Sequence, residues 1–201
     1  METTFSNLSL QFLVILLALA SLIKISLGGR QIDPKSSTQF IKTSCSSTRY
    51  PALCCASLLS QASTIQTSPQ LIVHAALNVS LFNAKTTTAS MVQLSKTHGL
   101  LPKETNAMQD CLEVLRDTEE ELRKSIGEMD KITSSNAGLT INNIQTWVSA
   151  ALTDEGTCSD VFEGKSISSN AKTSVKSQLL TVAHLTSNAL ALINDYASHL
   201  A

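Results

Sequence analysis

The fold class is decided by the stretch AKTSVKSQLLTVAHLTSNALALINDY, which spans residues 171–196. Apolar side chains recur in it at helical intervals, so that they line one face of an α-helix. This stripe consists of Ala171, Val175, Leu179, Val182, Ala189, Ile193 and Tyr196. The stretch therefore predicts a last helix of about eight turns whose apolar face is buried against other elements.

Three further segments upstream have the same helical spacing, and almost no segment has the alternation of a strand. The first begins after Ser68, a helix-capping residue followed by Pro69, and the second begins at Leu101-Pro102. The predicted core positions are Ile72, Ala75, Ala76, Val79, Phe82, Thr86 and Ala89 in the first, Met108, Leu112, Leu115, Leu122 and Ile126 in the second, and Ile141, Ile144, Val148 and Leu152 in the third.

Short polar segments mark the predicted helix ends. His98-Gly99 is expected to end the first helix, and residues 134–138 separate the second from the third. The segment 154–157 (DEGT) is turn-like and predicts the end of the third helix, with a loop continuing to about Ser168. Four long helices joined by short links predict an all-α fold, an up-down-up-down four-helix bundle.

The amino terminus has the pattern of an export signal. Residues 12–23 (FLVILLALASLI) form an apolar run that would be about 18 Å long as a helix, too short for a bilayer core of ~30 Å. Small residues follow it before Arg30, as at signal-peptidase sites. We interpret residues 1–29 as a secretory signal peptide, with an uncleaved anchor and a buried core helix as the alternatives. The mature chain is expected to be secreted and soluble, without a membrane partner.

The composition excludes several classes of protein. Lys and Arg number 15 and Asp and Glu 16, so the basic surplus of a nucleic-acid binder is missing. The sequence has no nucleophile elbow, metalloprotease motif, phosphate-binding glycine loop or dinucleotide fingerprint. The histidines have no ligand spacing with any cysteine, which argues against zinc. We therefore expect no enzymatic activity, no cofactor and no metal.

Five cysteines are present, at positions 45, 54, 55, 111 and 158. In an oxidising compartment pairs of them are expected to form disulfides. The region of Cys45 and Cys54 is expected to form a small helical hairpin closed by a disulfide, while Cys111 and Cys158 lie in separate predicted helices. The sequence alone does not choose among the possible pairings.

Acidic side chains lie on one side of the second predicted helix. Glu113, Asp117 and Glu120 are spaced by four and three residues and share one face. Such a charge run is usually a solvated face. Like charges at this spacing repel by a few tenths of a kcal/mol, which a purely structural helix does not need. A docking surface for a protein partner is the alternative interpretation.

A possible modification site lies in the first predicted helix. Asn78-Val79-Ser80 is a sequon for N-linked glycosylation. If it is used, Asn78 must face solvent while Val79 faces the core, which helical geometry allows.

Four segments of the chain resemble the plant invertase and pectin methylesterase inhibitor family. They are FIKTSC (40–45), YPALC (50–54), DCLE (110–113) and WVSAALTDEGTCSDVF (147–162). The resemblance extends over residues 38–200, which it identifies as one inhibitor domain. It implies a helical hairpin ahead of the four-helix bundle and the disulfides Cys45–Cys54 and Cys111–Cys158. Cys55 stands where family members often carry an aromatic residue.

The resemblance also implies a function, the inhibition of a secreted carbohydrate-active enzyme. Invertase inhibitors carry Pro-Lys-Phe after the fourth cysteine, and residues 162–167 (FEGKSI) lack it. This favours pectin methylesterase as the target, with cell-wall or vacuolar acid invertase as the alternative. The implied mechanism is a reversible 1:1 complex in the apoplast, in which a monomer covers the pectin cleft. The implied target-binding residues are Glu113, Asp117, Glu120, Thr157 and Asp160.

Two interpretations from other classes remain open. Secretion, helices and the adjacent cysteines 54 and 55 also occur in lipid-transfer-like carriers, although that family has more cysteines in a shorter chain. An enzyme with an unrecognised site is the second interpretation.

Overall fold

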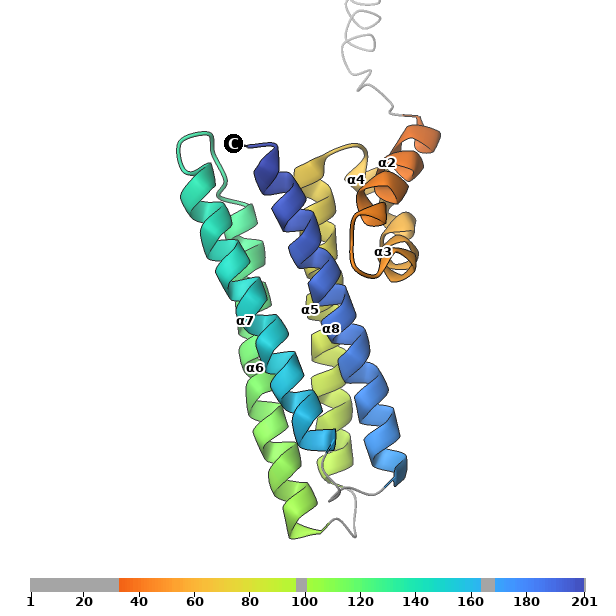
Figure 1. Cartoon of the computed structure of the whole chain (residues 1–201), viewed down its shortest axis with the longest axis vertical. Helices are drawn as coiled ribbons and strands as arrows, with labels where there is room; N and C mark the ends of the chain where they lie inside the picture. The colour runs from red at the N-terminus through yellow and green to blue at the C-terminus, as the bar shows by residue number, and fades with distance from the viewer. Residues whose placement is uncertain (1–32, 97–100, 164–168, 201) are drawn as a thin grey trace, which may run out of the picture. The chain divides into compact units, whose positions relative to one another are not determined.

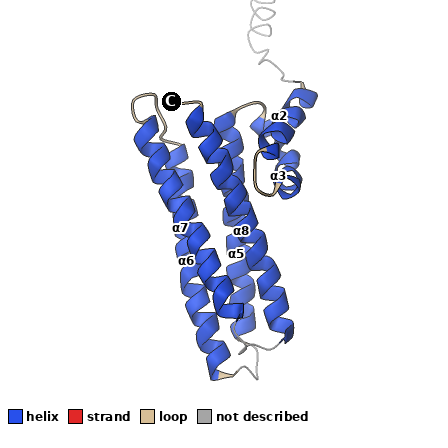
Figure 2. Ribbon diagram, in the orientation of Figure 1, coloured by secondary structure: helices blue, strands red, loops and turns tan. Residues whose placement is uncertain are grey.

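The computed structural model describes residues 33–96, 101–163 and 169–200. The predicted signal peptide, residues 1–29, and the predicted helix end at His98-Gly99 lie outside the described residues. The chain divides into two compact units, Met1–Asp33 and Pro34–Ala201. All the described residues except Asp33 belong to the second unit, and every regular element in them is helical (Figure 2).

Four long helices form the body of the second unit (Figure 1): α5 (Pro69–Ser95), α6 (Pro102–Met129), α7 (Ala137–Glu163) and α8 (Ser169–Ser198). Helices α5 and α7 each pack against both α6 and α8, so that α8 closes the ring against α5. Successive helices run in opposite directions (Figure 1). This is the all-α, up-down-up-down four-helix bundle that the sequence predicts.

A small helical hairpin precedes the bundle. Its helices are α2 (Pro34–Ser46) and α3 (Pro51–Leu58), followed by the 3-10 turn η1 (Leu59–Gln61) and α4 (Ala62–Ile65). A disulfide between Cys45 and Cys54 joins α2 to α3 across Cα atoms 5.6 Å apart. The hairpin packs against α5 and α8.

Local capping explains where the first two long helices begin. The Oγ of Ser68 accepts a hydrogen bond from the backbone N–H of Leu71 at 3.2 Å, and Pro69 follows in the first helical position. The carboxylate of Glu104 accepts from the N–H of Leu101 at 2.8 Å at the start of α6. Both starts are those predicted from the sequence.

The core is built from two clusters of buried aliphatic side chains. The larger cluster reaches from the hairpin into the bundle, with Leu77, Leu122, Ile144 and Val182 among its fully buried members. The smaller cluster surrounds a second disulfide, Cys111–Cys158, at the end of the bundle away from the hairpin. Cys55 belongs to neither bridge and is partly buried.

The predicted core face of α5 is wrong in its second half. Phe82 is 69% exposed, and Thr86 and Ala89 are exposed too. Because apolar residues surround this part of the helix, the spacing alone fits more than one stripe. The face that packs against α6 and α8 contains Leu77, Leu81, Ala84, Thr87 and Met91.

The predicted turn at residues 154–157 is also wrong, because α7 continues without a break to Glu163. Ala151, Glu155 and Cys158 follow one another at helical spacing and are all buried. Packing of this face against α6 and α8, together with the disulfide, outweighs the weak helix propensity of Asp154 and Gly156. Of the predicted loop, residues 164–168 lie outside the described residues.

Candidate functional site

The five predicted target-binding residues lie on two neighbouring helices, and all five are exposed. Three belong to α6 and two to α7, and these helices pack against each other along their length. We name the outward surface that they share the α6–α7 face, defined by Glu113, Asp117, Glu120, Thr157 and Asp160.

The second disulfide fixes the relative level of the two helices. Cys111 of α6 and Cys158 of α7 are joined with their Cα atoms 4.6 Å apart. Since Glu113 and Thr157 lie within two positions of these cysteines, each is within about 3 Å of the bridge along its helix axis. The antiparallel helices place Asp160 on one side of the bridge and Glu120 on the other, so the face extends over about 16 Å.

The charges on the α6–α7 face differ in how they are compensated. Glu120 forms an ion pair with Lys124 at 2.7 Å, one turn further along α6. The hydrogen bond to Lys124 lowers the pKa of the Glu120 carboxyl and raises the pKa of the lysine. Glu113 and Asp117 take part in none of the ion pairs within the described residues. These two carboxylates therefore carry most of the uncompensated charge of the face.

Two further acidic residues adjoin the face and are missing from the sequence prediction. Burial, and then repulsion from Asp154 and Asp117, raises the pKa of the Glu121 carboxyl to about 7. Burial and the charge of Asp117 also raise the pKa of Asp154. The carboxylates of α6 and α7 thus repel one another across the helix contact. Glu121 lies one turn beyond Asp117 in the sequence, but the wrongly predicted turn at Asp154 concealed this cluster.

A buried carboxyl lies behind this cluster. Glu155 is 1% exposed and faces α8, where the Oγ1 of Thr186 donates a hydrogen bond to its Oε1 at 2.7 Å. Burial raises the pKa of Glu155 to about 8, while the bond from Thr186 acts in the opposite direction. At neutral pH the folded chain therefore keeps Glu155 largely protonated, which avoids a buried charge.

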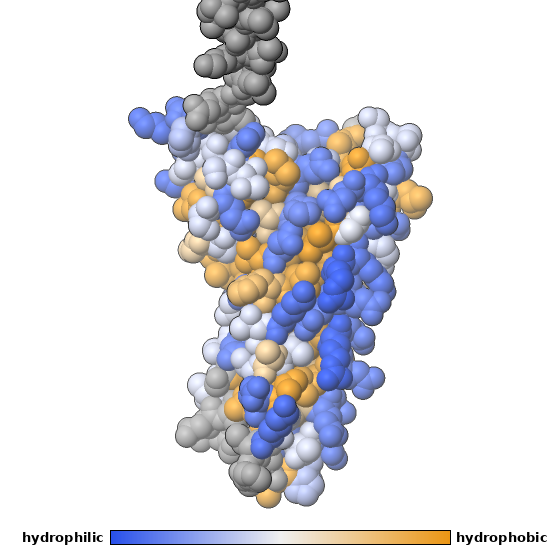
Figure 3. Space-filling view, turned by 180° about the vertical axis from the view of Figure 1, so that it is seen from behind, coloured by the Kyte–Doolittle hydropathy of each residue, from blue (hydrophilic) through white to orange (hydrophobic). Residues whose placement is uncertain are grey.

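The surface of the bundle reflects this distribution of charge. Seen from behind, hydrophilic side chains form a long band on the side of the bundle where α6 lies (Figure 3). The band is continuous with the solvent-facing side of α6, which carries most of the acidic run between Asp110 and Asp130. The face is therefore a long polar surface on two helices held together by a covalent bond.

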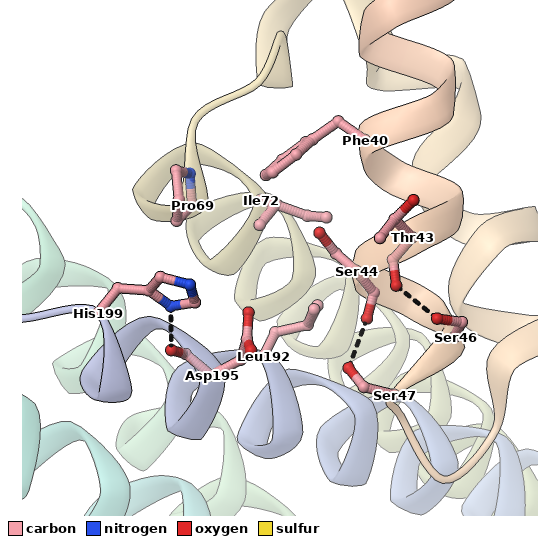
Figure 4. A pocket seen from close by; sticks show the side chains of 10 residues that line it. All are labelled: Phe40, Thr43, Ser44, Ser46, Ser47, Pro69, Ile72, Leu192, Asp195 and His199. Atoms are coloured by element: carbon pink, nitrogen blue, oxygen red, sulfur yellow. Dashed lines mark hydrogen bonds between the residues drawn. The ribbon is translucent and has the colours of Figure 1, made fainter.

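A cavity of about 430 Å³ lies between the hairpin and the bundle (Figure 4). Phe40, Ile72 and Leu192 form its apolar part. Its polar side chains bond mainly within their own segments: Ser46 donates to the carbonyl of Thr43, for example. Such a lining fits a structural gap between packed elements better than a built ligand site.

The described residues contain no group of three or more His, Cys, Asp or Glu side chains arranged to hold a metal ion. Over the same ranges, no helix is both long and apolar enough to span a bilayer. The α6–α7 face offers carboxylates and a hydroxyl on rigid helices, an arrangement suited to binding another surface.

Comparison with known proteins places this geometry in context. The family described as plant invertase/pectin methylesterase inhibitor matches residues 39–192. A protein of Daucus carota named 21 kDa protein is 44% identical over 80% of this chain and 84% of its own length. Pectinesterase inhibitor 11 of Arabidopsis thaliana is 40% identical over 83% of this chain and 84% of its own length.

A solved structure has the same fold. The crystal structure of mutant form A of a pectin methylesterase inhibitor from Arabidopsis superimposes with a TM-score of 0.62 at 20% sequence identity. The match covers 77% of this chain and 95% of the crystallised one. At this identity the likeness concerns the fold alone.

Proposed function

Because the chain belongs to the plant invertase/pectin methylesterase inhibitor family, we propose that it inhibits a pectin methylesterase by covering the cleft that binds pectin. The observation that carries the proposal is the exposed pair Glu113 and Asp117 on the α6–α7 face, next to Thr157 at the level of the Cys111–Cys158 disulfide. No covalent bond is made or broken in this mechanism.

The charge of the face supports this choice of target. Pectin is a chain of galacturonic acid, which becomes a polyanion as its methyl esters are removed. Carboxylates of such a chain are bound by hydrogen-bond donors, and most strongly by cationic ones. Glu113 and Asp117, free of ion pairs within the described residues, present carboxylates of the same chemistry.

The rigidity of the face supports tight binding. Glu113, Asp117, Glu120 and Thr157 lie in the interior of long helices, and Asp160 lies in the last turn of α7. The disulfide links the two helices at the level of Glu113 and Thr157. A surface that is already ordered loses little conformational entropy on association. We propose a monomer that binds one enzyme molecule, with Glu120, Thr157 and Asp160 completing the contact.

We also propose that the chain acts in the extracellular space, the cell wall in particular. Residues 1–29 have the pattern of a signal peptide, and an inhibitor of a secreted enzyme must meet it outside the cell. Amino-terminal sequencing of the protein recovered from the medium of a secretory host tests this. The secreted protein is expected to have its amino terminus near Arg30. Retention of the chain inside the cells would contradict the proposed secretion.

Titration of the purified mature protein against one pectin methylesterase and one acid invertase tests the function directly. At the mildly acidic pH of the cell wall, methanol release from pectin is expected to fall linearly until one inhibitor is present per enzyme molecule. Sucrose hydrolysis is expected to stay unchanged, and a charge-matched unrelated helical protein serves as the control. Unchanged methanol release at excess inhibitor would overturn the proposal, and inhibition of the invertase alone would assign the other target.

A further inference from the structure

Helix α5 presents an aromatic ring to solvent one turn after the sequon. Phe82 is 69% exposed, and Asn78, four residues before it, is exposed on the same face. A single exposed apolar side chain needs no explanation by itself. The neighbouring sequon Asn78-Val79-Ser80, however, suggests a reason for the exposure of Phe82. We propose that Asn78 carries an N-linked glycan whose first sugars lie over the ring of Phe82.

The local hydrogen bonds of Asn78 are compatible with this modification. Its Nδ2 donates to the carbonyl oxygen of His74 at 2.8 Å and lies 3.0 Å from Nδ1 of the same residue. On glycosylation a bond forms between Nδ2 and C1 of the sugar, while the bond from C1 to the lipid diphosphate donor breaks and the diphosphate leaves. Nδ2 releases one proton to the surrounding water and keeps the other. One of its two contacts with His74 can therefore persist in the folded glycoprotein.

The burial of Ser80, the third residue of the sequon, indicates when the glycan is transferred to Asn78. The side chain of Ser80 is fully buried, and its Oγ donates to the carbonyl of Ala76 at 3.1 Å. A transferase that must bind both Asn78 and Ser80 cannot reach the serine in the folded helix. The glycan is therefore added to the extended chain during export, and folding then leaves Asn78 on the surface and Ser80 in the core.

The surface beyond Phe82 suits a sugar chain. Positions 78, 82 and 86 follow one another at steps of four, over about 12 Å of helix. At Thr86 they reach a groove of about 340 Å³ between α5 and α8 in which every lining side chain is uncharged and can form hydrogen bonds.

Two details of this groove favour sugar hydroxyls as its occupants. The hydroxyls of Thr86 and Thr181 donate within their own helices, which leaves their oxygens as acceptors. The partly buried Gln178 also lines the groove. Sugar hydroxyls can donate to the two threonine oxygens, and the faces of pyranose rings pack well on an aromatic ring such as Phe82.

The proposed glycan leaves the inhibitory surface free. Helix α5 packs against α6 and α8 and lies across the ring of helices from α7. The α6–α7 face and the outward side of α5 are therefore separate surfaces. The proposal consequently stands or falls independently of the inhibition of pectin methylesterase.

Mass spectrometry of the protein secreted by a plant cell host tests the attachment. Glycopeptide analysis of the wild-type chain is expected to find a hexosamine-linked glycan on Asn78. N78Q and S80A each remove the sequon and are expected to lower the intact mass by that glycan, without changing inhibition. A wild-type protein secreted with unmodified Asn78 would overturn the proposal. The chain's other sequon, Asn7-Leu8-Ser9, falls in the predicted signal peptide.

A second experiment tests the contact between the glycan and the ring of Phe82. F82S retains the sequon, and K85A is a control at another exposed position of α5 that creates no new sequon. An endoglycosidase that cuts between the first two sugars is expected to act several-fold faster on native F82S than on the wild type, and at the wild-type rate on K85A. Equal rates for all three proteins would exclude contact between glycan and ring.

Discussion

The side-chain amide of Asn188 in α8 binds both backbone polar groups of Tyr50, in the loop of the hairpin. The N–H of Tyr50 donates to Oδ1 at 2.9 Å, and Nδ2 donates to the carbonyl of Tyr50 at 3.0 Å, across a sequence separation of 138. The ring of His184, one turn earlier in α8, stacks on the ring of Tyr50 with centroids 3.6 Å apart. These contacts fix the hairpin to the bundle.

Replacement of Asn188 by alanine is expected to loosen the hairpin. The two backbone groups of Tyr50 would lose their partners in a part-buried position, which costs about 1–3 kcal/mol of unfolding free energy. Urea denaturation measures the loss, and hydrogen exchange locates it in residues 34–65. Asn194→Ala is the control, because Asn194 is exposed and bonds only to Gln145 across the helix surface. Equal losses of unfolding free energy in the two variants would show that Asn188 does not fix the hairpin to the bundle.

The two disulfides are expected to contribute unequally to stability. Cys111–Cys158 closes a loop with a sequence separation of 47, and Cys45–Cys54 one of 9. In the chain-entropy account, removal of the disulfide that closes the longer loop lowers the unfolding free energy by roughly 4 kcal/mol. Removal of the other disulfide lowers it by roughly 3 kcal/mol. Denaturation of C111A/C158A and of C45A/C54A measures both values. A larger loss from the short loop would mean that native contacts, and not loop closure, determine the effect.

Glu155 is expected to make the protein less stable as the pH rises. Between its unfolded pKa near 4.5 and its folded pKa of about 8, the folded chain binds a proton that the unfolded chain has released. The unfolding free energy therefore falls as the pH rises through this window, and the contribution of Glu155 is fully lost above pH 8. Glu155→Gln can still accept from Thr186 but does not ionise. It should match the wild type at pH 4 and exceed it at pH 9, by a few kcal/mol in order of magnitude.

Thermal unfolding between pH 4 and pH 9 checks this prediction. Glu121, whose pKa is raised to about 7, contributes a slope of the same sign in the wild type and in the variant. The difference between the two curves therefore reports the ionisation of Glu155, including its repulsion with Glu121 and Asp154. Parallel curves for wild type and Glu155→Gln would contradict the assignment.

Sequence reasoning predicted those features that depend on periodicity and local signals. Ser68-Pro69 and Leu101-Pro102 start helices through bonds made within a few residues, so their sequence neighbours suffice to identify them. The exposure of Glu113 and Asp117 likewise follows from their position opposite the apolar stripe of α6.

The features that the sequence did not predict depend on contacts between distant segments. Asp154 and Glu155 look like turn residues until α6 and α8 pack around them. The exposure of Phe82 depends on which of two apolar stripes of α5 the neighbouring helices select. The pairing of Asn188 with Tyr50 has no local signal at all, because it exists only once the hairpin has docked.

Salt is expected to weaken the complex with the enzyme. Exposed charges accelerate association when potentials are complementary, and ions screen them over about 10 Å at 0.1 M. Surface plasmon resonance across a range of NaCl concentrations is expected to record a falling association rate for the wild type. The slope should be shallower for E113A/D117A, which lacks two carboxylates that take part in none of the ion pairs within the described residues. Identical slopes would assign the salt dependence to other residues.

The inhibition constant of E113A/D117A against a pectin methylesterase tests the central claim most directly. The control is D130A/D195A, which removes the same charge from exposed positions outside the α6–α7 face. We predict that E113A/D117A inhibits at least about tenfold more weakly, a change of about 1.4 kcal/mol, with an unchanged melting temperature. The control should inhibit like the wild type. Wild-type inhibition by a folded E113A/D117A would contradict the account and move the contact surface elsewhere.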